Sequence, residues 1–193
     1  ASPLPPSPEK EEPAEKEKTA APVRPAKPFT SPIAKAQRRV TKKPFGLEIL
    51  PGHSPVENDR FTGYHVGVDF ETFENEQATD VPISAICTGA LLMKTYANGY
   101  GGVAVQECEL ENRTVSVIYG HLNLASITHN AKDTLTQGDR VGILGDGYSE
   151  QTDGVRKHLH LGVREASTKD IRGYVKDPSE ISRWLDPLLY MTW

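Results

Sequence analysis

Long hydrophobic runs, phosphate-binding loops and an excess of basic residues are all missing from this sequence of 193 residues. No stretch approaches the ~20 consecutive apolar residues of a transmembrane helix, which excludes a membrane span within the sequence. The 22 Lys and Arg residues are outnumbered by 26 Asp and Glu. This balance argues against nucleic acid as a partner, because neutralising phosphates takes a basic face. The absence of a P-loop and of a dinucleotide-binding glycine pattern argues against the common nucleotide-binding domains.

An N-terminal Met and a hydrophobic signal region are also missing, since the sequence begins at Ala1. We therefore expect any targeting or anchoring segment to lie outside this sequence, where it would provide a membrane tether. The remaining composition, 37% hydrophobic and 25% charged, is ordinary for a globular protein. The length suffices for one domain of ordinary size plus a tail.

Cysteine is scarce, with only Cys87 and Cys108. A hairpin that turns at Asn98-Gly99 would place Cys108 opposite about position 90 rather than opposite Cys87. We therefore favour two buried free thiols, and a disulfide in an oxidising compartment stays the alternative.

Residues 1–44 differ in composition from the rest of the chain. They hold ten of the fifteen prolines, almost no aromatic residues, and mixed blocks of Glu and Lys. Such a segment cannot bury enough apolar surface to offset its conformational entropy, and its prolines keep it semi-extended. We expect a disordered Pro-rich linker over 1–44, acting as a tether or as a terminus without a role. The folded domain is expected over 45–193.

From residue 45 onward the pattern is that of short strands separated by turns rich in glycine. The candidate strands, rich in β-branched and alternating apolar residues, cover 45–50, 66–70, 83–94, 102–106, 114–119 and 137–145. Near the end, Asp177 and Pro178 have the N-cap and first-position chemistry of a helix start. The sequence therefore predicts a mainly β fold, a single antiparallel sheet domain with one or two short helices.

His158 and His160 form the most informative pair in the chain. In a β-strand, residues two apart share a face, so both imidazoles lie on one side. The apolar residues Leu159, Leu161 and Val163 then face the core. Two imidazoles on one rigid face make half of a metal site.

The other half is supplied by His65 and Asp69, a histidine and a carboxylate four residues apart. Two neutral imidazoles and one carboxylate suit a catalytic Zn²⁺, which keeps a fourth position open for water. A fully extended chain would hold His65 and Asp69 more than ~12 Å apart, so the backbone must curl between them. Gly67 makes that curl feasible. Spacing alone does not rank His158 against His160 as the third ligand.

Together with His121, in the run Tyr-Gly-His-Leu, these motifs in this order resemble the M23 family of zinc metallopeptidases of the lysostaphin and LytM type. The resemblance covers roughly residues 47 to 190. It implies a substrate groove and one zinc ion per chain, with the ligands His65, Asp69 and His160. It also implies that His121 and His158 share the catalytic work, one as general base and the other orienting water or stabilising the oxyanion. Which does which stays open.

The resemblance further implies a substrate, a reaction and a location. The substrate would be the stem or cross-bridge peptide of bacterial peptidoglycan, cleaved by attack of zinc-activated water without a covalent enzyme intermediate. The location would be extracytoplasmic: secreted, periplasmic or associated with the cell envelope. The alternative is a catalytically inactive relative that binds or activates another cell-wall hydrolase. A biotinyl or lipoyl carrier is a weaker alternative, because it would not need the histidines.

Four residues beside the motifs are candidates for lining the groove. Tyr64 and Tyr119 flank motif histidines, although simple packing explains them equally well. Asn123 either orients His121 or caps the following turn. Arg60 is a candidate for holding a substrate carboxylate. A blocking segment within 1–60, occupying the open metal position, is a further alternative.

Overall fold

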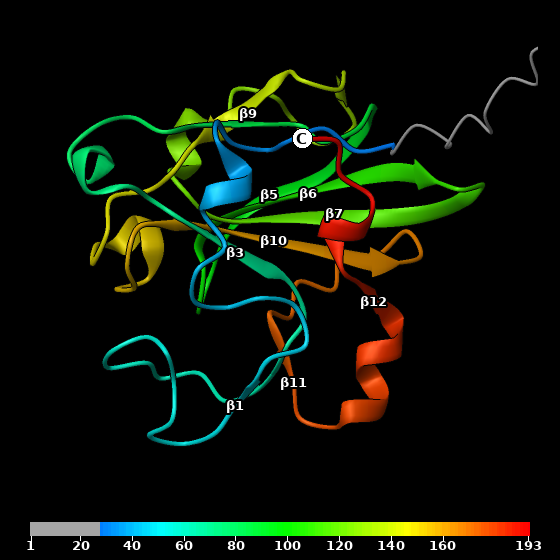
Figure 1. Ribbon diagram of the computed structural model, residues 1–193. Coiled ribbons are helices and arrows are strands. Elements are labelled where there is room, and N and C mark those ends of the chain that lie inside the picture. The colour runs from blue at the N-terminus through cyan, green and yellow to red at the C-terminus, as the bar shows by residue number, and fades with distance from the viewer. Residues whose placement is uncertain (1–27) are drawn as a thin grey trace, which may run out of the picture.

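The computed structural model describes residues 28–193 (Figure 1). Phe29, Ile33 and Ala36 are buried in the main core, and Phe29 forms a β-bridge with Met191 near the other end of the chain. The folded part therefore includes residues 28–44, because these apolar side chains pack into the main core. The proline content of the segment did not indicate this packing. The expected linker residues 1–27 lie outside the described part of the chain.

A seven-stranded, antiparallel sheet is the centre of the described structure (Figure 1). Its strands lie in the order β12 (Trp184–Leu185), β10 (His158–Glu165), β7 (Arg113–Leu122), β6 (Gly101–Leu110), β5 (Gly89–Ala97) and β8 (Thr134–Leu135). The seventh strand, β3 (Val68–Glu71), pairs with the first half of β10. The predicted mainly β, antiparallel fold is confirmed.

Two smaller sheets and short helices complete the fold. The smaller sheets contain β1 (Glu48–Ile49), β2 (Gly63–His65) and β11 (Tyr174–Val175), and β4 (Pro82–Ser84) with β9 (Arg140–Ile143). Every helix among residues 28–193 is a 3-10 helix, and none is long and apolar enough to cross a membrane. These helices are η1 (Ala36–Arg38), η2 (Glu74–Glu76), η3 (Leu124–Ser126), η4 (Glu150–Thr152), η5 (Pro178–Arg183) and η6 (Pro187–Leu189).

The expected helix start at Asp177 is confirmed at η5. The Asp177 side chain accepts a hydrogen bond from the backbone N–H of Ser179, and Pro178 is the first helical residue. The segment is a 3-10 helix of six residues. It leads directly into β12, where Trp184 is buried against the large sheet.

The two faces of the large sheet have different roles. Leu159, Leu161 and Val163 of β10 belong to the main hydrophobic core, which also contains the residues of the 28–44 segment. Because side chains alternate along a strand, His158 and His160 lie on the opposite face. That face has a smaller apolar cluster around Ile118, Val103, Val105 and Trp184. The two histidines therefore extend from a strand whose opposite face packs into the main core.

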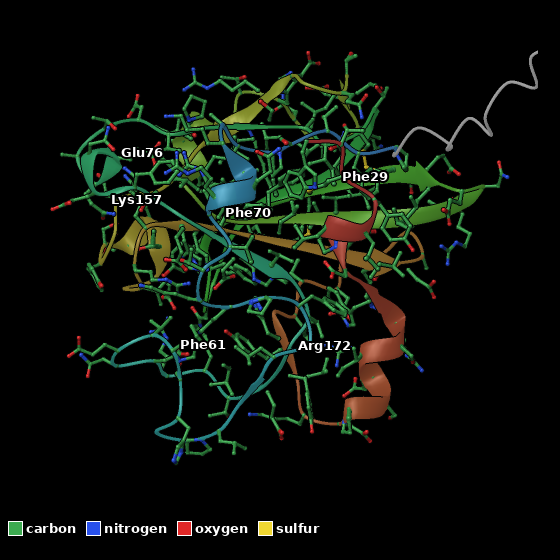
Figure 2. The ribbon with its side chains drawn as sticks, in the orientation of Figure 1. Phe29, Phe61, Phe70, Glu76, Lys157 and Arg172 are labelled. Atoms are coloured by element: carbon green, nitrogen blue, oxygen red, sulfur yellow. A yellow bond between two sulfur atoms is a disulfide. The ribbon has the colours of Figure 1, made fainter. Side chains whose placement is uncertain are left out.

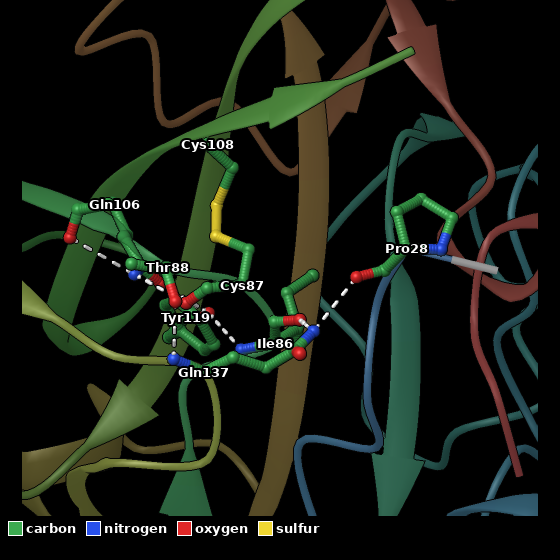
Figure 3. Close-up of a disulfide and its surroundings, with 9 residues drawn as sticks. Pro28, Ile86, Cys87, Thr88, Gln106, Cys108, Tyr119 and Gln137 are labelled. Carbon is green, nitrogen blue, oxygen red and sulfur yellow. Dashed lines mark hydrogen bonds between the residues drawn. A yellow bond between two sulfur atoms is a disulfide. The ribbon is translucent and has the colours of Figure 1, made fainter. Parts of the chain in front are cut away.

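Cys87 and Cys108 form a disulfide, so the favoured interpretation of two free thiols is wrong (Figure 3). Their Cα atoms are 6.0 Å apart. The hairpin register shifts between Leu91 and Met93, and the chain bends at 86–88 before β5 begins. The prediction that Cys108 lies opposite position 90 assumed regular pairing from the turn onward. The register shift and the bend change that pairing and bring the two sulfur atoms together.

Candidate metal centre and active site

His65 and Asp69 meet because the chain interrupts its extended course between them. β2 ends at His65 and β3 begins at Val68, with Val66 and Gly67 in the break. His65 Nε2 lies 3.2 Å from Asp69 Oδ1, and both side chains are almost completely buried. The curl that the sequence required is therefore present.

β10 brings in the third donor. His160 is directly opposite Asp69 of β3 on one edge and Gly120 of β7 on the other. Its Nδ1 lies 3.0 Å from His65 Nε2 and 3.1 Å from Asp69 Oδ1. Three potential ligand atoms from three strands thus converge on one point.

These three atoms fit a zinc ion. A tetrahedral zinc with nitrogen and oxygen ligands at about 2.0–2.2 Å separates neighbouring donors by about 3.3 Å. The distances of 3.0, 3.1 and 3.2 Å among His65 Nε2, His160 Nδ1 and Asp69 Oδ1 are close to that value. His65 Nδ1 lies 3.1 Å from the carbonyl oxygen of Pro44, which only accepts, so the neutral ring leaves its Nε2 lone pair for a metal. Two imidazoles and a carboxylate grouped in this way match the ligand set of catalytic zinc.

His121 reaches the site through a β-bulge. Between β6 and β7, Val103 pairs with Gly120 and Gly102 pairs with Leu122, which leaves His121 as the extra residue. Its φ of 62° lies in the left-handed region, which is unusual for a residue other than glycine. A bulge redirects a side chain, and here it interrupts the regular alternation of β7 beside the site.

The two histidines that are not candidate ligands have the same hydrogen-bonding arrangement. His121 Nδ1 lies 2.9 Å from the carbonyl oxygen of Tyr100, and His158 Nδ1 lies 2.8 Å from that of Arg156. A carbonyl accepts only, so each Nδ1 donates and each Nε2 is left for other chemistry. The two rings are adjacent, with centroids 4.2 Å apart.

Burial and neighbouring charges set the ionisation of these groups. Burial lowers the pKa of His160 to about 4, against the opposing effect of Asp69. Burial also lowers the pKa of His121 well below its usual value, and the nearby His158 adds to this effect. Burial alone would raise the pKa of Asp69, but the imidazoles of His65 and His158 outweigh it and hold that pKa well below its usual value. Near pH 7 the lowered pKa values therefore keep His121 and His160 neutral and Asp69 ionised.

A cavity of about 430 Å³ opens onto these groups and is lined by Asp69, His121, His158 and His160. Its outer wall is formed by residues 169–174 and by Phe61. Phe61 and Arg172 lie on the side of the large sheet where β1 and β11 also lie (Figure 2). A hollow of this size accommodates a short stretch of an extended substrate.

Stacking and polar contacts hold the aromatic wall of the cavity. The rings of Phe61 and Tyr174 stack with centroids 5.4 Å apart and an angle of 7° between planes. The ammonium group of Lys43 donates to Tyr174 Oη at 2.8 Å and pairs with Asp59 at 2.5 Å. Among residues 28–60, Lys43 alone contributes to the lining, and it is engaged by these partners. No other described residue between 28 and 60 lines the cavity.

The two tyrosines considered for the groove lie outside this cavity lining. Tyr119 is fully buried in the main core, where its hydroxyl donates to Gln106 and accepts from the backbone N–H of Ile86. Tyr64 packs against the smaller apolar cluster, and its hydroxyl is hydrogen-bonded to Glu48, which raises the pKa of Tyr64. The side chain of each therefore has a packing role.

Asn123 and Arg60 also lie outside the lining of the cavity. Asn123 caps η3 by accepting a hydrogen bond from the backbone N–H of Ala125. Arg60 forms an ion pair with Asp153, and its side chain is half-exposed. It lines a second hollow of about 280 Å³ that neighbours the first.

Tyr100 and Arg156 are site residues that the sequence analysis did not identify. Both line the cavity, and their carbonyl groups orient His121 and His158. A signal for Arg156 was present, because the alternation that groups His158 with His160 extends back to position 156. Tyr100 is the last residue of the turn before β6, and the pairing of β6 with the bulged end of β7 brings it to His121.

Solved structures share the fold. A Helicobacter pylori Csd3 structure aligns with a TM-score of 0.52 and 20% identity, over 87% of this chain and 36% of that one. A structure of LytU aligns with a TM-score of 0.50 and 19% identity, over 77% of this chain and 81% of that one. A structure of the SpoIIQ–SpoIIIAH pore-forming complex gives a TM-score of 0.55 and 17% identity, over 86% of this chain and 91% of that one.

Sequence comparison is more specific. The chain is 31% identical over 122 residues to Endolysin 2638A of Staphylococcus phage 2638A, which covers 62% of this chain. It spans 23% of the length of that endolysin. Peptidase family M23 matches residues 63–172, more than half of the chain and the part that contains all five candidate site residues. The chain therefore belongs to peptidase family M23.

Proposed function

We propose that the chain is a zinc-dependent endopeptidase that hydrolyses peptide bonds in bacterial peptidoglycan. The observation that supports this most directly is the convergence of His65 Nε2, Asp69 Oδ1 and His160 Nδ1 within 3.2 Å of one another. In this proposal these atoms hold one zinc ion per chain. Such an ion, when bound, lowers the pKa of water and polarises a carbonyl group.

His121 is suited to act as the general base. Its Nδ1–H is engaged by the carbonyl of Tyr100, so the free Nε2 lone pair is available to the cavity. Burial lowers its pKa, which keeps the ring neutral and able to accept a proton at neutral pH. In the proposed reaction, His121 takes the proton of the attacking water and later delivers it to the leaving amine.

His158 is suited to stabilise negative charge. Its Nδ1 donates to the carbonyl of Arg156, and its Nε2 lies 3.3 Å from Asp69 Oδ2. Because Nδ1 already carries a proton, Nε2 is protonated only in the imidazolium form of His158. In that form Nε2 would donate either to Asp69 or to the oxygen of a substrate carbonyl as it becomes an oxyanion. The proposed division of labour is thus base for His121 and electrophile for His158.

The proposed substrate class is inferred from the similarity to a phage endolysin. Endolysin 2638A is by name a phage endolysin, and it is 31% identical to this chain over 122 residues. The proposed location is extracytoplasmic, where peptidoglycan lies. The disulfide between Cys87 and Cys108 supports this location, because disulfides persist in oxidising compartments.

Analysis of cleavage products tests the proposed function. Purified peptidoglycan is incubated with the chain, and the soluble products are examined for new amino and carboxyl termini and for new reducing sugar ends. An endopeptidase releases fragments with new peptide termini and no new reducing ends, and loses this ability after zinc is chelated. Binding to peptidoglycan without any new terminus would favour the alternative of an inactive binding or activating module.

A further inference from the structure

Arg156 lies two residues before the start of β10 and extends its side chain to two carboxylates of β3. The side chain is 11% exposed. Its Nη2 donates to Asp69 Oδ2 at 2.8 Å and to Glu71 Oε1 at 2.5 Å. Its Nε donates to Glu71 Oε2 at 2.9 Å. The guanidinium therefore bridges a candidate metal ligand and a carboxylate that belongs to no candidate ligand set.

The two oxygens of Asp69 face different groups. Oδ1 lies 3.2 Å from His65 Nε2 and 3.1 Å from His160 Nδ1, at the candidate metal position. Oδ2 lies 2.8 Å from Arg156 Nη2 and 3.3 Å from His158 Nε2. Because Arg156 holds Oδ2, rotation of the carboxylate toward the metal position would break a charge-assisted hydrogen bond.

Glu71 holds the guanidinium in place. Asp69 and Glu71 are two residues apart on β3, so their side chains share a face, and two carboxylates so close would repel each other without a cation between them. Arg156 provides that cation in a planar, forked form that reaches both carboxylates at once. A lysine ammonium is a point charge and lacks this fork.

We propose that Arg156 is a positioning residue of the metal site, which fixes Asp69 so that a single oxygen faces the metal. The same residue accepts the Nδ1–H of His158 through its carbonyl, at 2.8 Å, and so connects the metal ligands to the catalytic pair. This inference rests on the proposed zinc site. If the salt bridge of Arg156 only stabilised the fold, its removal would leave the zinc affinity unchanged. The inference predicts that the zinc affinity falls.

Zinc affinity tests the inference. The dissociation constant is measured by competition with a chromophoric chelator for the wild-type chain, R156M, R156K and R164M. Arg164 is a matched control, because it lies on β10, is 13% exposed and pairs with Asp170, which is not a candidate ligand. We expect R156M to bind zinc about 10–100-fold more weakly, as for other groups that orient metal ligands. R156K should fall between R156M and the wild type, and R164M should match the wild type.

A spectroscopic readout complements the affinities. Cobalt-substituted protein absorbs in the visible region with an intensity that depends on coordination, so a carboxylate freed to bind through both oxygens should change the spectrum of R156M and not that of R164M.

If R156M does not fold, R156K and Glu71→Gln, which removes the second carboxylate that holds Arg156, should still weaken zinc binding. Wild-type affinity in all foldable variants at Arg156 and Glu71 would overturn the inference alone. A wild-type chain that binds no zinc would overturn both the inference and the proposed function.

Discussion

The backbone of Gly67 lies directly against the imidazole ring of His160. A Cβ atom at position 67 would be 2.5 Å from Cε1 and 2.6 Å from Nε2 of that ring. The glycine between His65 and Asp69 therefore does two things: it allows the chain to leave its extended course, and it leaves room for the third candidate ligand.

Replacing this glycine should damage the metal site. G67A would push the His160 ring away from His65 and Asp69, so we expect zinc affinity to fall by about 10-fold or more. Isothermal titration with zinc would measure the change. G162A is the control, since a Cβ at Gly162 meets its neighbours at 3.5 Å, an ordinary contact distance. Equal zinc affinity in G67A and G162A would show that the site does not depend on this close approach.

Substitution of the histidines should separate ligands from catalytic groups. H160A and H65A each remove one of three donors, and we expect zinc affinity to fall by more than about 100-fold, beyond the loss typical of orienting groups. H158A should bind zinc within about 10-fold of the wild type, because its Nε2 faces Asp69 Oδ2 rather than the metal position. Metal content after dialysis distinguishes the two classes. Full zinc content in H160A would remove that residue from the ligand set.

The zinc-free chain should become less stable as the pH falls below neutrality. In the folded chain burial lowers the pKa of His160 to about 4, whereas an unfolded histidine titrates near ~6.5. Between these values the unfolded chain binds a proton that the folded chain does not, so the free energy of unfolding decreases as pH drops from about 6.5 to about 4. The loss from this residue is about 3 kcal/mol. The lowered pKa of His121 acts in the same direction as the pH falls below about 6.5, and the lowered pKa of Asp69 does so only below about pH 3.8.

Denaturant unfolding of the zinc-free protein at several pH values would measure this effect. H160N should lose part of the dependence, since the substituted side chain does not titrate. A free energy of unfolding that stays constant or increases on acidification would show that these imidazoles are not held neutral by the fold.

The disulfide should stabilise the fold without affecting the metal site. Cys87 and Cys108 are separated by 21 residues and belong to the main core, whereas the histidines face the cavity. Replacing both cysteines by alanine should therefore lower the free energy of unfolding by about 3 kcal/mol and leave zinc affinity unchanged. Thermal unfolding and zinc titration of the same sample check both statements. A parallel loss of zinc affinity would mean that the two sides of the sheet are coupled.

Features that depend on local periodicity were predictable from the sequence. The alternation in β10 predicted that His158 and His160 share a face, and the structure has them there with the apolar residues on the other. The conflict between the spacing of His65 and Asp69 and an extended strand predicted a break at Gly67. Both inferences need only the geometry of one strand.

Features that depend on pairing between distant segments were not predictable in this way. His121 lies at a bulge that exists because β6 and β7 change register, and Cys87 meets Cys108 through a similar shift. The hydrogen bond from Arg156 to Asp69 requires β3 and β10 to be neighbours, although the two residues are 87 positions apart in the chain. Composition also concealed the buried segment after residue 28, because its few apolar residues are surrounded by prolines.

Zinc content and release of peptidoglycan fragments, measured together for the wild type and H121A, test the central claim most directly. H121A removes the proposed base but none of the three proposed ligands. We predict about one zinc ion per chain in both proteins, with fragment release by the wild type and none by H121A. Fragment release by H121A at the wild-type rate would contradict the proposed role of His121. A wild type with neither zinc nor release would contradict the account of this chain as a metallopeptidase.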